Sequence, residues 1–160
     1  MANLGWRSGA LLLLLVGGCG GGGSKTKLVA NQAVGNTGGM VSTTSGTSIA
    51  VPPGAVTGNT EITISTTTAE PTSSAATPVS ESFLFGPEGA QFATPVEVRI
   101  PFDASKIPSG GSTADLVILT APKDSPNFVR LETTVDGNFL VAKTSHFSVF
   151  LGAYVPGSNC

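Results

Sequence analysis

Apolar residues recur at every second position in short runs from about Met40 to Leu151. These runs are Ile49 and Val51; Ile62 and Ile64; Phe83 and Phe85; Val96, Val98 and Ile100; Leu116 and Ile118; Phe139 and Val141; and Phe147, Val149 and Leu151. A period of two over four to seven residues is typical of half-buried strands. Around Val98 it places Glu97 and Arg99 on the opposite face. Since no window of ten or more residues has helical periodicity, the pattern predicts short strands.

Turn residues separate the apolar runs. They form the groups Pro52-Pro53-Gly54, Gly58-Asn59, Gly86-Pro87, 108–111 and 124–127. Asp136-Gly137 lies between residues 133–135 and 138–141, which predicts a hairpin whose primed turn needs positive φ. The Ser/Thr/Ala/Pro-rich stretch from Thr66 to Thr77 is expected to be a long surface loop. Short strands with frequent turns predict an all-β fold, an antiparallel β-sandwich.

Residues 1–18 have the three-part layout of an export signal. Residues 1–8 form a short start with one positive charge, Arg7, and residues 10–16 are an apolar run containing five consecutive leucines. This run is shorter than the roughly 20 apolar residues that cross a bilayer. The stretch Leu15-Val16-Gly17-Gly18-Cys19 resembles the bacterial lipobox, which implies that the Cys19 thiol is lipidated and the leader removed. The alternative is an ordinary signal peptide with a cysteine nearby by chance.

Lipid on Cys19 would anchor this chain to a membrane, which is its predicted binding partner. Each buried methylene contributes about 0.8 kcal/mol, so two or more acyl chains hold a protein almost permanently. Residues 20–24 form a Gly-rich leash. In lipoproteins an aspartate after the cysteine retains the protein at the inner membrane. Gly20 stands there, which implies the outer membrane.

The remaining chain has room for one domain. We expect a lipidated cysteine and flexible linker over residues 19–37, a β-sandwich over 38–153 and a tail over 154–160. The chain has 8 basic and 10 acidic residues, and cleavage before Cys19 would remove one basic residue, Arg7. This weakly acidic balance does not suggest a nucleic-acid partner.

The only cysteines are Cys19 and Cys160, and the only histidine is His146. This set contains no closely spaced metal ligands, so the sequence predicts no metal and no cofactor. Lipid on Cys19 would leave Cys160 as a free thiol. The alternative is a bridge between the two cysteines.

Three stretches of the chain resemble a ZU-five domain, the module named for zonula occludens proteins and the netrin receptor Unc-five. They are residues 38–42 with 46–56, the stretch Phe85 to Phe92 with Pro95 to Pro101, and His146-Phe147-Ser148. The resemblance covers about residues 34–153 and implies an antiparallel β-sandwich. It also implies binding of proteins, as in animal adaptors and cytoskeletal linkers. In the central stretch Phe85 and Phe92 are expected to bracket a bend with buried rings.

The His146-Phe147-Ser148 triplet has the only candidate chemistry. In an extended strand the imidazole and the Ser148 hydroxyl project to one face, as nucleophilic activation requires. In some family members this triplet marks self-cleavage, which here implies a cut between Phe147 and Ser148, with Ser148 as nucleophile and His146 as base. The alternative is structural, with Phe147, Val149 and Leu151 in the core and His146 capping a strand end through a hydrogen bond.

Three classes of function therefore stay open. The main prediction is a membrane-anchored envelope lipoprotein with a non-catalytic interaction or structural module, whose envelope protein partner is unidentified. The second is the self-cleaving domain. The third is an envelope hydrolase, in which Asp103, Asp115 or Glu97 would be the acid partner of His146.

Overall fold

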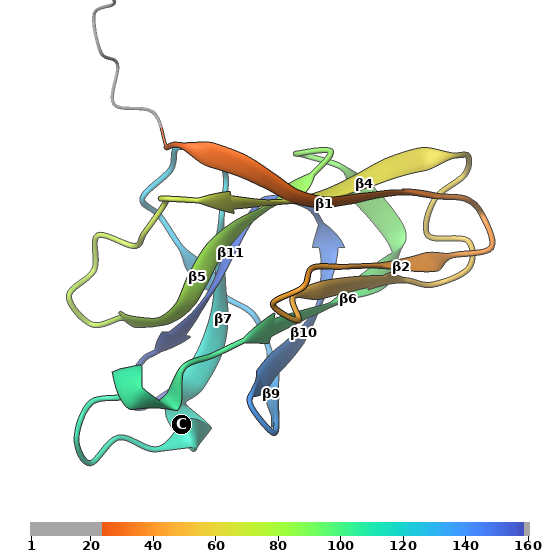
Figure 1. Ribbon diagram of the computed structural model, residues 1–160. Helices are drawn as coiled ribbons and strands as arrows, with labels where there is room; N and C mark the ends of the chain where they lie inside the picture. The colour runs from red at the N-terminus through yellow and green to blue at the C-terminus, as the bar shows by residue number, and fades with distance from the viewer. Residues whose placement is uncertain (1–23, 159–160) are drawn as a thin grey trace, which may run out of the picture.

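The computed structural model describes residues 24–158, drawn in colour in Figure 1. The predicted export signal, Cys19 with its lipobox, and Cys160 lie outside these residues. Among the described residues, no helix is long and apolar enough to cross a membrane.

Two antiparallel sheets form the fold, which confirms the predicted β-sandwich (Figure 1). The six-stranded sheet has the order β1 (Thr26–Val34), β4 (Thr60–Thr67), β5 (Thr77–Gly86), β11 (Val149–Tyr154), β7 (Leu116–Ala121) and β8 (Val129–Arg130). The five-stranded sheet has the order β2 (Gly39–Ser42), β3 (Ser48–Val51), β6 (Gln91–Pro101), β10 (Phe139–His146) and β9 (Thr133–Asp136). Two short 3-10 helices, η1 (Ala104–Lys106) and η2 (Thr113–Asp115), lie between β6 and β7.

The main core lies between the two sheets. Its largest fully buried side chains come from both layers: Phe83, Phe85, Phe147, Phe150, Ile49, Ile62, Ile64, Ile100, Ile118, Leu140 and Val34. Most of the predicted alternating positions point into this core, as expected for a sandwich. Aromatic rings fill its centre, where Phe85 stacks on Phe150 at 4.8 Å between ring centroids.

Strands β7 and β11 are buried on both faces. All six residues of β7 are buried, although the alternation at Leu116 and Ile118 predicted one exposed face. The second face forms a smaller hydrophobic cluster of Val117, Leu119, Leu151, Ala153 and Val155. Ala76 and Phe128, from the segments before β5 and β8, pack against it. Loops thus cover the outside of this sheet over β7 and β11.

The predicted linker over residues 19–37 is wrong for residues 26–34, which form β1. This strand pairs with β4 along its length, from Thr26 opposite Thr67 to Val34 opposite Thr60. The sequence signal is weak because β1 lies at a sheet edge and buries only Val34, with Ala30 half-buried. A bulge between Leu28 and Ala30 also interrupts the alternation.

The predicted hairpin exists, but its turn is shifted by one residue. Asp136 is paired with Phe139, so Gly137 and Asn138 form the two-residue loop. Gly137 has φ of 59°, while Asp136 is not among the residues with positive φ. Glycine at the first loop position is typical of a type II′ turn. The predicted surface loop is also shorter, because β4 extends to Thr67 and β5 begins at Thr77.

The inward face of β10 is the opposite of the one predicted. Leu140, Ala142 and Thr144 are buried, whereas Phe139 and Val141 point outward and are half-buried. The Arg99 guanidinium lies over the Phe139 ring, 4.2 Å from its centroid, which explains an aromatic residue on the outer face.

Candidate interaction site

The His146-Phe147-Ser148 triplet forms a crossing between the two sheets. His146 is the last residue of β10, and β11 begins in the other sheet at Val149. The prediction that His146 and Ser148 share one face of an extended strand is therefore wrong. The chain must bend here because consecutive strands enter different layers.

The histidine contacts Thr144 and not Ser148. The Thr144 hydroxyl donates to the His146 carbonyl at 3.0 Å and lies 3.4 Å from its Nδ1 atom. Ser148 is 7% exposed. Among residues 24–158, no hydrogen bond joins the His146 imidazole to the Ser148 hydroxyl. This geometry holds a strand end and does not by itself activate a nucleophile.

Backbone hydrogen bonds hold the crossing against the bend between β5 and β6. The Gly89 amide donates to the Phe147 carbonyl, and the Phe147 amide donates to the Ala90 carbonyl, both at 3.0 Å. The Phe147 ring packs edge-on against Phe92 at 4.6 Å and Phe85 at 6.1 Å. The prediction that Phe85 and Phe92 bracket this bend with buried rings is confirmed.

None of the three candidate acids lies at the crossing. Asp103 follows β6, where its amide donates to Val79 at the start of β5. The Asp115 carbonyl accepts from the Val155 amide, just after the last residue of β11, whereas Ser148 lies just before the first residue of that strand. Glu97 is exposed on the five-stranded sheet. The Ser105 hydroxyl, which donates to Asp103 at 2.6 Å, lowers the pKa of that carboxyl. Within residues 24–158, no three His, Cys, Asp or Glu side chains form a metal-binding group.

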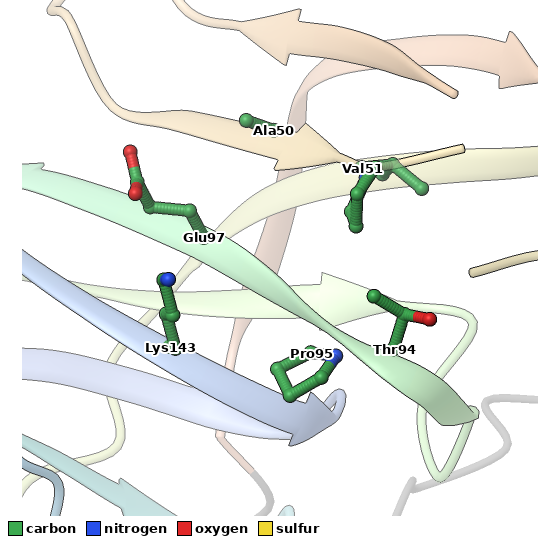
Figure 2. Close-up of a pocket in the computed structure, with 7 residues that line it drawn as sticks. Ala50, Val51, Thr94, Pro95, Glu97 and Lys143 are labelled. Atoms are coloured by element: carbon green, nitrogen blue, oxygen red, sulfur yellow. The ribbon is translucent and has the colours of Figure 1, made fainter. Parts of the chain in front are cut away.

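A groove of about 430 Å³ crosses the outer face of the five-stranded sheet. It lies over β3, β6 and β10, and Figure 2 draws the seven residues that line it: Ala50, Val51, Pro52, Thr94, Pro95, Glu97 and Lys143. Small apolar side chains and proline form most of this lining. We call this feature the sheet groove.

Two opposite charges lie in the sheet groove. Lys143 on β10 is directly opposite Glu97 on β6, and Figure 2 shows both side chains beside the apolar residues. Both residues are exposed. Within residues 24–158 the only ion pair is a different one, Arg99 with Asp136 at 2.7 Å. Each charge is therefore available to a group bound in the groove.

The alternation along residues 95–100 places Glu97 on an outer face but does not by itself predict the groove. The alternation of Val96 and Val98 also places Pro95 outward, which is the only sequence signal for this site. The sequence does not assign Ala50 of β3 or Lys143 of β10 to this groove. The alternation along β10 predicts the opposite inward face, and the order β3-β6-β10 is a property of the tertiary structure.

The large exposed hydrophobic residues of the described chain all lie on edge strands. They are Leu28 and Val29 on β1, Met40 on β2, Val129 on β8 and Val135 on β9. Edge strands have unpaired backbone groups, so these positions can add a further strand. The sandwich thus has a grooved face and apolar edges.

Comparison with protein families assigns this β-sandwich to a class of interaction domains. The family model of the ZU5 domain matches residues 30–114. The chain therefore belongs to the ZU5 domain family, and a ZU5 domain indicates a protein-interaction module. No curated protein matches the chain.

Proposed function

We propose that this chain is a membrane-anchored envelope lipoprotein whose ZU5 domain binds another protein and catalyses no reaction. The sheet groove is the main observation that supports the binding role. A ligand segment in the groove would contact the apolar side chains of Ala50 and Pro95 and meet one charge of each sign, Glu97 and Lys143. Apolar contact with flanking charges is typical of protein recognition.

The anchor is supported by the sequence alone. Lipid on Cys19 would hold the domain at the outer membrane, and the short segment to Lys25 would keep it near the surface. Growth with an alkyne analogue of palmitate should label the protein, and Cys19→Ser should abolish the label. Density-gradient separation of the two membranes should place the labelled protein in the outer-membrane fraction. An unlabelled wild-type protein would contradict the anchor and leave the binding role open.

A capture experiment tests the binding role. The domain without residues 1–23 would be fixed to a resin and exposed to envelope extract. Lys143→Glu reverses one charge in the groove, so it should remove a specific partner. The matched control, Arg130→Glu, makes the same change on β8 of the other sheet. A partner lost with both variants, or with neither, would contradict binding at the groove.

Self-cleavage is the second candidate function. The observation that favours it is the Gly89 amide, which donates to the Phe147 carbonyl at 3.0 Å. A serine attack on this carbon would place negative charge on that oxygen, where the amide would stabilise it. Intact-mass measurement of purified protein should then show a cut between Phe147 and Ser148. The cut should vanish in Ser148→Ala and His146→Ala. A single uncut wild-type species excludes this function.

A further inference from the structure

The outer edge of β1 is the longest unpaired strand edge among residues 24–158. β1 has nine residues and pairs only with β4, and Figure 1 shows it along the outside of the sandwich. The other edge strands have four residues or fewer. Leu28 and Val29 lie on β1 and are 55% and 41% exposed. An edge with these properties is a template for another strand.

Alternate residues of β1 present their backbone groups to this edge. The Thr68 amide donates to the carbonyl of the residue just before β1 at 3.2 Å, which makes that pair hydrogen bonded. Bonded and non-bonded pairs alternate along an antiparallel ladder. Every second residue of β4 counted back from Thr68, namely Thr66 and Ile64, therefore belongs to a bonded pair. Ser65 and Thr63 lie between these and belong to non-bonded pairs, with Leu28 and Asn31 as their partners on β1. The amides and carbonyls of Leu28 and Asn31 therefore point away from β4, to the free edge.

The same two residues share one face of the sheet. Ile62 and Ile64 of β4 are fully buried, so Ser65 and the other alternate residues of β4 point outward. Side chains of directly paired residues project to the same face. Leu28 and Asn31 thus both point outward, although three positions separate them, because the bulge inserts one residue between them.

We propose that two copies of this chain associate through their β1 edges, antiparallel about a two-fold axis, with Leu28 of one copy opposite Asn31 of the other. In this register Leu28 and Asn31, whose side chains both point to the outer face of the sheet, lie opposite each other. Their free amides and carbonyls therefore face the same groups of the second copy. It also places Lys27 opposite Gln32 and so avoids like charges facing each other. Val29 of each copy lies near the axis, so the exposed apolar side chains of both copies meet there.

The lipid anchor would favour this association, a step that rests on the proposed function. Anchoring confines the copies to one membrane, which raises their effective concentration. In the proposed register the two Thr26 residues are seven strand positions apart, about 24 Å at roughly 3.4 Å per residue. The six residue-to-residue steps from Cys19 to Lys25 can span up to about 20 Å. Both anchors can therefore reach the same bilayer.

Cysteine cross-linking of the full chain in its own membrane tests the register. In a Cys160→Ser background, Leu28→Cys with Asn31→Cys should give a disulfide-linked dimer on mild oxidation. Each single variant should remain uncrosslinked, because like positions would lie about 10 Å apart, beyond disulfide reach. No dimer from the double variant overturns the proposal. So does an equal yield from a single variant, or a cross-link to a protein of another mass.

A charge variant tests the surface independently. Leu28→Lys places two like charges near the axis and removes apolar contact, but it changes only an exposed side chain of the folded chain. Sedimentation equilibrium of the detergent-solubilised protein should show association weakened about tenfold or more. Met40→Lys on β2 is the matched control and should leave association unchanged. Equal effects of both variants overturn the proposal, while palmitate labelling reports separately on the anchor.

Discussion

The outer faces of the two sheets differ in what covers them. On the six-stranded sheet, Leu119, Leu151 and Ala153 are buried although they point away from the main core, because Ala76 and Phe128 pack over them. On the five-stranded sheet, no comparable layer lies over the corresponding face in the described chain. Its side chains there, such as Glu97 and Lys143, are exposed around a groove.

This difference separates stability from recognition. Burial of apolar surface contributes roughly 25 cal/mol per Å², so the covered face adds to the stability of the sandwich. The open face contributes little by burial, and its side chains can therefore contact a partner without unfolding the domain. The two faces should respond differently to mutation.

The largest effect is expected on the covered face. Leu151→Ala should lower the free energy of unfolding by about 2–5 kcal/mol, because it leaves a cavity beside β7. Val141→Ala, the matched change on the open face, should cost less than about 1 kcal/mol. Urea denaturation measures both. Equal losses would show that the two faces are not distinct.

A smaller loss is expected where the covering loop is attached. The buried Ser82 hydroxyl donates to the Ala69 carbonyl at 2.6 Å, which ties the segment between β4 and β5 to the sheet. Ser82→Ala should cost about 1–2 kcal/mol because it leaves that carbonyl without its donor. Limited proteolysis should also cut residues 68–76 faster. Ser42→Ala, at an exposed position of the five-stranded sheet, is the control. An equal loss of unfolding free energy in both variants would argue against a stabilising role of the Ser82–Ala69 hydrogen bond.

A still smaller effect is expected from the ion pair on the open face. Arg99 is bonded to Asp136 at 2.7 Å and lies over Phe139, but the two charged side chains are 35% and 62% exposed. Solvent screens such pairs, so Arg99→Met should cost at most about 1 kcal/mol, and less at high salt. Thermal unfolding of the wild type, Arg99→Met, Asp136→Asn and the double variant at two salt concentrations measures the contribution of this ion pair to stability. A salt-independent loss of more than about 2 kcal/mol would refute this assignment.

The smallest effect is expected at Asp103, which lies on neither outer face. Its carboxylate accepts from the Ser105 hydroxyl and amide, which lowers its pKa from the ordinary value of an aspartate. A depressed carboxyl pKa stabilises the fold above the unfolded pKa, and this contribution is lost as pH falls through the folded pKa. NMR titration should show Asp103 changing charge at a lower pH than an ordinary aspartate, and Ser105→Ala should raise that midpoint. Identical midpoints in both proteins would count against the hydrogen bond as the cause.

The regular strands were predictable because their apolar residues repeat with the period of the backbone. The runs at Val96 to Ile100 and at Ile62 and Ile64 bury one face of a strand, so apolar residues occupy every second position and the strands can be recognised from the sequence. The edge strand β1 was missed because it buries almost nothing. The orientation of β10 was predicted wrongly because Phe139 is apolar yet packs outward under Arg99.

The amino-acid sequence by itself determined the strand-rich sandwich, the family and the aromatic bend between β5 and β6. These depend on local alternation, turn residues and a specific run of side chains. Only the tertiary structure decided that His146 and Ser148 lie at a crossing between sheets, that loops cover the outer face of β7 and β11, and that a groove and a free β1 edge remain open. Strand order and loop packing join residues far apart in the chain, and no local pattern contains those contacts.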